Sequence, residues 1–444
     1  MNAKILKTIM LILLLFCLCL QSNASLALPS VQRTVLPNRL ILLVCEEHSL
    51  PFVTLQLLIP SGSSKDPSGE EGLSYLTAKG LLLGTSKRNA TAIYEELDFI
   101  GASLRSSPGR DYATLNLKVM KKDLEKGFDL FMEVLTQPTF PEDEIKREVE
   151  KTLAAIQSAE DDPGEVAEKE FQKALFLESP YAHPVEGTRE SLPRITRKAI
   201  HQFFRTYYHP NNSIFTIVGD ITPDEVRKKL LPRLIQWPMV EVPERPFQLT
   251  FAKGPKTVTI NRNITQANLI LGHQGVSRGN PDYYALIVMN HILGGGGFSS
   301  RLVEEIRVKR GLAYSVGSFF DVGKFPGSFQ IVIQTKNESA REAITLSLQE
   351  MERIRKEPVL EKDLERTKKY LVGSFPMRID TQAKLANFFT QVEFYGIGHD
   401  YPKKYSTLIH SVTREDILRV AQKYLQPKNT ILVVVANLKE AGME

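Results

Sequence analysis

Histidine is the residue type most often used to bind metals or to move protons near neutral pH, and this 444-residue chain contains eight histidines. They are His48, His183, His201, His209, His273, His291, His399 and His410. No two of them have the spacing that would place a pair of ligands on one helix face. The chain also lacks a Cys–His arrangement and a glycine-rich phosphate loop. These residue types therefore indicate no local catalytic centre.

The segment from Glu71 to Thr85 reads E-G-L-S-Y-L-T-A-K-G-L-L-L-G-T. It resembles the signature helix of the pitrilysin, insulysin and mitochondrial processing peptidase family, which reads approximately G-x-x-H-x-x-E-H-x-x-x-x-G-T. In that motif two histidines at i and i+4 bind zinc, and the glutamate activates the zinc-bound water as general base. Here Tyr75 stands at the first histidine position, Ala78 at the glutamate position and Lys79 at the second histidine position.

The resemblance implies a third zinc ligand, a glutamate on a later helix. Counting seventy-six positions from Lys79, as in the processing-peptidase branch, reaches Ala155. All three ligands and the general base are therefore missing. Lys79 would add a positive charge and Ala78 offers no acid–base group. We expect this chain to bind no metal or other cofactor, and the resemblance implies that zinc is held by a partner subunit. The acidic run Glu160-Asp161-Asp162 is more typical of a solvated loop than of a replacement site.

Further segments carry the same resemblance through most of the chain. S-P-Y-A-H-P-V-E-G-T-R-E-S-L (Ser179 to Leu192), followed by Y-Y-H-P-N-N-S and V-G-D (Tyr207 to Asp220), is similar to the end of the family's first half. N-H-I-L-G-G-G-G-F-S-S-R-L (Asn290 to Leu302) and I-R-V-K-R-G-L-A-Y-S-V (Ile306 to Val316) are similar to its second half. The segments occur in the order that the family shows.

In family members the second half supplies an arginine and a tyrosine that reach the substrate at the zinc site. Arg307 and Tyr314 match this pair, seven residues apart. A tyrosine hydroxyl can donate to a scissile carbonyl as negative charge builds on its oxygen, and a guanidinium can orient a peptide carbonyl. Gly311, between them, would let the chain turn from a helix into a strand. The alternative interpretation is an exposed arginine and a core tyrosine.

Four consecutive glycines, Gly294, Gly295, Gly296 and Gly297, follow an apolar helical pattern. They do not form a nucleotide-binding fingerprint, because they follow a helix and lack the G-x-G-x-x-G phasing. One interpretation is a flexible loop that ends the helix. The other is a lining of small residues that an extended peptide can approach closely, so that these glycines bind substrate.

The elements that must position these residues mix strands and helices. Strands are predicted over Arg39 to Cys45, Val53 to Ile59 and Tyr112 to Val119, and helices over Asp123 to Leu135 and Glu142 to Ala159. The segment Gln236 to Phe247 carries prolines at 238, 243 and 246, which favour an extended linker.

The two sides of this linker are related to one another. Ile195 to Ile221 aligns without a gap to Val412 to Leu438, at an offset of 217 residues. Each segment predicts a threonine-capped helix, a proline turn and a buried β-branched strand. We therefore predict an α+β protein with two homologous domains, residues 32–236 and 247–444, joined by a linker over 237–246. Each domain should be a mostly antiparallel sheet with packed helices. The family resemblance implies that the pair forms half of a clam-like chamber.

The N-terminus has the pattern of a secretory signal peptide over residues 1–27. Lys4 and Lys7 precede an apolar run from Ile9 to Leu20, which is short for a membrane span, and Ala24 and Ala27 are both possible cleavage points. Cleavage would lower the net charge from +5 to +3, which gives no reason to expect a nucleic-acid partner. It would also leave Cys45 as the one cysteine, interpreted as a packing residue, so no intramolecular disulfide could form. We predict an exported protein of the bacterial periplasm without stable membrane insertion.

Taken with the resemblance, these residues predict the non-catalytic, substrate-binding subunit of a heterodimeric zinc peptidase. Its partner would be a homologous chain that carries H-x-x-E-H, and peptides would be the substrates. The rival hypothesis is a structural or scaffolding subunit without a role in proteolysis. Retention of Arg307 and Tyr314 favours the first hypothesis.

Overall fold

The computed structural model describes residues 30–244 and 247–444, and residues 31–444 form one compact unit. The predicted signal peptide lies outside the described residues, as do positions 245 and 246 of the predicted linker. Among the described residues, no helix is long and apolar enough to cross a membrane.

The first half, residues 30–244, contains a six-stranded sheet in the order β1-β2-β6-β3-β5-β4. The strands are β1 (Val31–Val35), β2 (Ile41–Glu46), β3 (Phe52–Ile59), β4 (Ser103–Pro108), β5 (Ala113–Met120) and β6 (Ile214–Gly219). Only the β2–β6 pair is parallel, and all other neighbours are antiparallel. The strand predicted from Arg39 begins two residues later, because Arg39 has φ 62° in a tight turn.

The second half, residues 247–444, contains a five-stranded sheet in the order β7-β11-β8-β10-β9. The strands are β7 (Lys256–Asn261), β8 (Gln266–Gln274), β9 (Ala313–Asp321), β10 (Ser328–Lys336) and β11 (Ile431–Ala436). Its parallel pair is β7–β11, and β11 then pairs antiparallel with β8. Strands β7, β11, β8, β10 and β9 thus take the places of β2, β6, β3, β5 and β4 of the first sheet, and β1 has no counterpart. The predicted α+β architecture of two related, antiparallel-rich sheets is confirmed.

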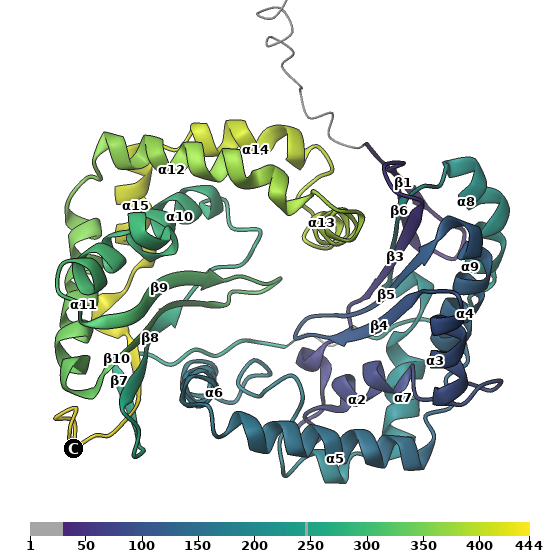
Figure 1. Cartoon of the computed structure of the whole chain (residues 1–444), viewed down its shortest axis with the longest axis horizontal. Coiled ribbons are helices and arrows are strands. Elements are labelled where there is room, and N and C mark those ends of the chain that lie inside the picture. The colour runs from purple at the N-terminus through teal and green to yellow at the C-terminus, as the bar shows by residue number, and fades with distance from the viewer. Residues whose placement is uncertain (1–29, 245–246) are drawn as a thin grey trace, which may run out of the picture. The chain divides into compact units, whose positions relative to one another are not determined.

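Helices pack around both sheets (Figure 1). Those of the first half are α2 (Leu73–Gly80), α3 (Ala90–Phe99), α4 (Leu124–Thr136), α5 (Glu142–Ala159), α6 (Pro163–Phe176), α7 (Arg197–Tyr207), α8 (Pro223–Lys229) and α9 (Leu231–Gln236). Those of the second half are α10 (Tyr283–Asn290), α11 (Ala340–Lys356), α12 (Glu361–Ser374), α13 (Gln382–Phe394), α14 (Tyr401–His410) and α15 (Arg414–Tyr424).

The repeated segments adopt the same local structure. Helices α7 and α15, the turns that follow them, and strands β6 and β11 all begin and end at positions 217 residues apart. The side chains of Thr196 and Thr413 cap the two helices by accepting hydrogen bonds from backbone N–H groups of the first turn. The predicted helix–turn–strand repeat is confirmed.

Each sheet is also covered by one helix from the other half of the chain. Helix α6 packs on β8 and β11 of the second sheet, and α13 packs on β3 and β6 of the first (Figure 1). Phe171 of α6 is buried with Ile270 and Val433 of the second sheet. On the first sheet, the buried hydroxyls of Thr216 and Thr390 are 2.7 Å apart in a hydrogen bond. The two halves therefore complete each other's cores.

Residues at two of the predicted boundaries are part of the folded first half. Trp237, predicted as the first linker residue, is buried in the first core, and its carbonyl accepts a hydrogen bond from the Asn38 side chain. The predicted start at residue 32 falls inside β1, whose Arg33 forms a 2.9 Å ion pair with Glu393 of α13. The division of the chain into two domains at the proline-rich segment stays a prediction. Cys45 is fully buried, and burial raises the pKa of its thiol to about 12, as suits a packing residue.

His273 of β8 connects the second sheet to the turn before β11. Its Nε2 accepts a 3.1 Å hydrogen bond from the backbone N–H of Gln426, and Nδ1 lies 2.8 Å from the carbonyl oxygen of Gln274. The ring stacks on Phe329 at 5.1 Å between centroids. Burial lowers the pKa of His273 to about 4, so the folded protein holds the neutral imidazole.

We predict that this histidine makes stability depend on pH between about 6.5 and 4. The unfolded chain takes up the proton first, so stability should fall as the pH drops through this window, by about 1.4 kcal/mol per pH unit from this residue. His273→Gln keeps a donor and an acceptor but does not titrate. Urea unfolding of both proteins at several pH values measures the difference, and parallel pH profiles would contradict the assignment.

Candidate functional site

Helix α2 carries the three positions that correspond to the zinc motif. Ala78 is buried, whereas Tyr75 and Lys79 are half-buried and lie one turn apart on one face. The Lys79 ammonium is 5.6 Å from the centre of the Tyr75 ring. The two positions that would hold histidine ligands are therefore brought together, but they form a cation–π contact instead.

The facing surface of α5 is likewise unsuited to bind a metal. Burial raises the pKa of Tyr75, and this effect outweighs the lowering by a hydrogen bond with Thr152 of α5. Ala155 is exposed, whereas the next residue, Ile156, is buried and lines a cavity. Because each helical residue turns by about 100°, Ala155 and Ile156 point in different directions, and Ile156 is the one that packs inward. Neither Ala155 nor Ile156 can be a ligand.

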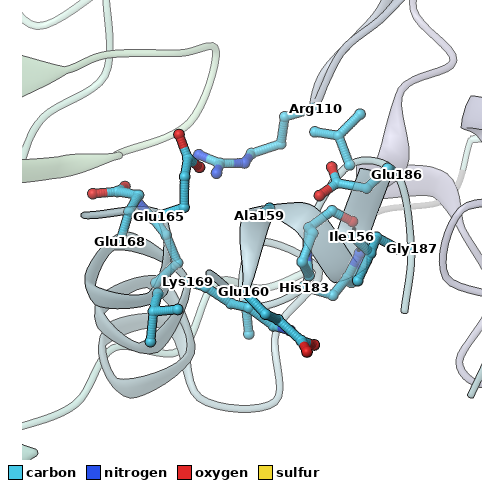
Figure 2. Close-up of a pocket in the computed structure, with 15 residues that line it drawn as sticks. Arg110, Ile156, Ala159, Glu160, Glu165, Glu168, Lys169, His183, Glu186 and Gly187 are labelled. Atoms are coloured by element: carbon cyan, nitrogen blue, oxygen red, sulfur yellow. Dashed lines mark hydrogen bonds between the residues drawn. The ribbon is translucent and has the colours of Figure 1, made fainter. Parts of the chain in front are cut away.

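A cavity of about 240 Å³ opens beside Ile156, between α5, α6 and residues 182–187. Glu165 and Glu168 extend into it from α6, Glu186 lies across from them, and Arg110 reaches in between (Figure 2). Several of its charged groups have partners within the fold. The Glu168 carboxylate accepts a 3.2 Å hydrogen bond from Gln330 of β10.

The acidic run beside this cavity serves structural contacts. Arg189 forms a 2.8 Å ion pair with Glu160 and lowers the pKa of that carboxyl group. Asp162 caps α6 by accepting a 2.7 Å hydrogen bond from the Gly164 N–H. In residues 30–244 and 247–444, no group of three or more His, Cys, Asp or Glu side chains is arranged to hold a metal ion. The residues present at the motif do not fit a zinc ion.

The second group of predicted residues lies in the second half. Arg307 is in a single π-helical turn (Val303–Val308), and Tyr314 is the second residue of β9. Gly311 makes the turn between them at φ 64°. The Arg307 guanidinium carbon lies 5.6 Å from the Tyr314 ring centre and 4.9 Å from that of Phe298. The structure thus brings the predicted pair together.

The two aromatic side chains of this group are turned to solvent, whereas Arg307 is half-buried. Tyr314 is 70% exposed and Phe298 is 71% exposed. Among the described residues, Arg307 makes no ion pair and the Tyr314 hydroxyl makes no hydrogen bond. Tyr314 is therefore not the core residue of the alternative interpretation. Sequence reasoning missed Phe298, although a large apolar residue directly after four glycines was the available signal.

Most of the glycine run has a packing explanation. Residues His291–Gly295 form a π-helical turn against β9. A Cβ at Gly294 would lie 2.5 Å from the Ser318 hydroxyl oxygen of β9, and one at Gly295 would lie 2.7 Å from the Asn290 amide nitrogen. A Cβ at Gly296 would lie 2.6 Å from the His291 carbonyl oxygen. Gly297 has open space around it and φ 55°, a backbone conformation that favours glycine. The substrate-lining interpretation of the run stays a prediction.

Within the described residues, no hydrogen bond, ion pair or ring contact joins the α2 residues to the group around Arg307. The chain therefore holds two separate groups. One is a helix face on which a zinc site has been replaced by Tyr75 and Lys79. The other is a cluster of half-buried Arg307 with exposed Tyr314 and Phe298 beside the glycine run.

Two family models match this chain, one in each half. Residues 42–189 match the family described as Insulinase (Peptidase family M16), and residues 194–371 match the Peptidase M16 inactive domain. An uncharacterized zinc protease of Mycobacterium leprae is 31% identical over 308 residues, which are 68% of each chain. The non-peptidase homolog YmxG of Helicobacter pylori is 25% identical over 399 residues, 89% of this chain and 91% of that protein.

A solved structure shows the same fold. The peptidase M16 inactive domain from Pseudomonas fluorescens superposes with a TM-score of 0.86 at 28% identity, over 91% of this chain and 97% of the other. This chain belongs to peptidase family M16, the family that includes insulinase. Within it, the chain is a peptidase-like member whose signature helix lacks the zinc-binding residues.

We predict that a zinc site can be rebuilt only with the inward position of α5. A variant with Tyr75→His, Ala78→Glu, Lys79→His and Ile156→Glu should bind one zinc ion, since the ligands then share one site. The matched control carries Ala155→Glu in place of Ile156→Glu and should bind zinc at least about tenfold more weakly. Metal analysis with chelator competition measures both. A tightly held, stoichiometric zinc in the unchanged protein would contradict our assignment of the site.

Proposed function

We propose that this chain is the non-catalytic, substrate-binding subunit of a heterodimeric zinc metallopeptidase. Its partner is a homologous chain that carries the H-x-x-E-H motif and the zinc ion, and the two together hydrolyse peptides. The observation that carries this proposal is the pairing of half-buried Arg307 with exposed Tyr314, with ring and guanidinium 5.6 Å apart. A chain that had lost every role in proteolysis would have no use for both side chains in the positions of the family's substrate contacts.

The pair offers two functions toward a peptide bound at the zinc site of the partner. The Tyr314 hydroxyl donates a hydrogen bond to the carbonyl oxygen of the scissile bond as negative charge builds there. The Arg307 guanidinium presents fixed N–H donors that orient a neighbouring peptide carbonyl. The contact with the Tyr314 and Phe298 rings limits the directions that the Arg307 side chain can take.

The proposed place of action is the bacterial periplasm. The positive N-terminal residues, the apolar run from Ile9 to Leu20 and the small residues near Ala27 support export. Unfolded peptides small enough to enter a chamber between the two subunits are the proposed substrates.

We predict that Tyr314→Phe lowers turnover of the reconstituted heterodimer by roughly a hundredfold, because one donor to the developing oxyanion is lost. Assembly should survive, since the exposed hydroxyl makes no hydrogen bond with the described residues. Arg307→Ala should also lower activity, mainly through substrate positioning. The measurement is steady-state peptide hydrolysis by the chain mixed with its H-x-x-E-H sister.

Tyr94→Phe is the matched control, because Tyr94 lies on α3 and is 47% exposed. It removes the same hydroxyl and should leave hydrolysis unchanged. The scaffolding hypothesis instead predicts that substitutions at Arg307 and Tyr314 leave peptide hydrolysis unchanged. Full peptidase activity in a heterodimer that carries both Tyr314→Phe and Arg307→Ala would decide for a scaffold.

A further inference from the structure

A second cavity lies in the second half of the chain, away from the residues considered so far. It has a volume of about 240 Å³ and is lined by residues between Arg278 and Tyr401. Its walls come from the segment before α10, from the turn Phe375–Arg378, and from α13 and α14. Five aromatic side chains line it: Tyr283, Phe375, Phe388, Tyr395 and Tyr401.

The charges of this cavity all have one sign. Arg278, Arg378 and Lys384 line it, and no acidic residue does. Lys384 is neutralised by a 2.8 Å ion pair with Asp380. Within residues 30–244 and 247–444, neither Arg278 nor Arg378 forms an ion pair with a carboxylate. Two guanidinium groups of this cavity are therefore without a carboxylate partner in the described part of the chain.

The arginines are held by aromatic rings rather than by acids. The Arg278 guanidinium carbon lies 3.8 Å from the Tyr283 ring centre and 5.5 Å from that of Tyr401. The Arg378 guanidinium carbon lies 5.4 Å from the Tyr405 ring centre. Stacking on a ring face fixes the plane of a guanidinium while leaving its edge N–H donors free to bind an oxyanion. This arrangement suits a planar carboxylate, which accepts two parallel hydrogen bonds from one guanidinium.

The cavity also continues into a larger one of about 600 Å³. The two share Arg278, Tyr283, Asn387, Gln391 and Tyr395. Asn387 and Gln391 lie one turn apart on α13, and Gln391 Nε2 donates a 3.4 Å hydrogen bond to Asn387 Oδ1. Their other amide atoms, Asn387 Nδ2 and Gln391 Oε1, are the ones that can bond the backbone of an extended peptide. The small cavity is thus the cationic end of a longer polar space, which suits the end of a chain better than an internal acidic side chain.

From this geometry we propose that the cavity around Arg278 and Arg378 binds the C-terminal carboxylate of a peptide whose last side chain is aromatic or large and apolar. The carboxylate bonds the two guanidinium groups, and the last side chain packs among the rings of Phe375, Phe388 and Tyr395. This inference rests on the proposed function in that it takes the ligand to be a peptide. It adds an anchor for the chain end at a place other than Arg307 and Tyr314.

The test measures binding to this chain alone, without the sister subunit, by titration calorimetry. The probes are an N-acetylated tetrapeptide ending in phenylalanine and the same peptide with a C-terminal amide. We expect the free acid to bind at least about tenfold more tightly than the amide, since the amide loses the charge-assisted bonds. Arg378→Gln and Arg278→Gln should each weaken binding of the acid about tenfold or more and leave the amide unchanged.

Three further variants serve as controls for this experiment. Arg353→Gln on α11 is the matched control, because Arg353 is paired with Glu350 and Glu357, and it should change nothing. Arg278→Lys keeps the charge without the fork and should bind with intermediate affinity. If Arg278→Gln unfolds, exposed Arg378 carries the test. A combined Tyr314→Phe and Arg307→Ala variant should still bind the acid, which separates this anchor from the proposed catalytic contacts.

Equal affinity for acid and amide would overturn the proposal, and so would unchanged affinity in Arg378→Gln. Displacement of the peptide by inorganic phosphate at the same concentration as by free peptide acid would show a general anion site and also overturn it. Because turnover by the heterodimer is not measured, a negative result here leaves the proposed role of Tyr314 standing.

Discussion

The structure depends most on the need of each sheet to bury both of its faces. Helices of the same half cover one face, and the other face would expose apolar strands such as β6 and β11 to water. Each of these faces is covered by a helix from the other half of the chain. Helix α6 of the first half covers β8 and β11, and α13 of the second half covers β3 and β6. Phe171 is buried in the first of these contacts, and the Thr216–Thr390 hydrogen bond lies in the second. Folding of either half is therefore tied to folding of the other.

This constraint explains how the signature helix can lose its metal and stay in place. Its position is determined by packing, because Leu73, Leu76 and Ala78 are buried in the first core. The half-buried residues Tyr75 and Lys79 then form a cation–π contact with each other, and Tyr75 also has a hydrogen bond with Thr152. A catalytic zinc ion serves chemistry, and in this chain apolar packing alone accounts for the position of the helix. The loss of the ligands leaves a folded peptidase-like surface.

The exposed group around Arg307 has the opposite energetic character. Large aromatic side chains such as Phe298 and Tyr314 are more than two-thirds exposed, which contributes little to the stability of this chain. Their support is rigid, because Gly294 and Gly295 pack without a Cβ against β9 and Asn290. A rigid frame beneath exposed aromatic and cationic groups is the usual design of a surface that binds another molecule. In the cavity of the second half, the guanidinium groups of Arg278 and Arg378 are likewise supported by aromatic rings.

Local sequence determined much of this protein. The apolar periodicity predicted α5 to the residue and α4 within one residue, and the 217-residue repeat predicted two helix–turn–strand units with matching bounds. The missing ligands at Tyr75, Ala78 and Lys79 were also readable, since the motif is contained in one turn of helix. Contacts between distant segments were not, because periodicity reports which face of an element is apolar but not which partner covers it. Only the tertiary structure decided that α6 packs on the second sheet and α13 on the first. It also decided that Ile156 rather than Ala155 is buried, and that Arg278 and Arg378, a hundred residues apart, line one cavity.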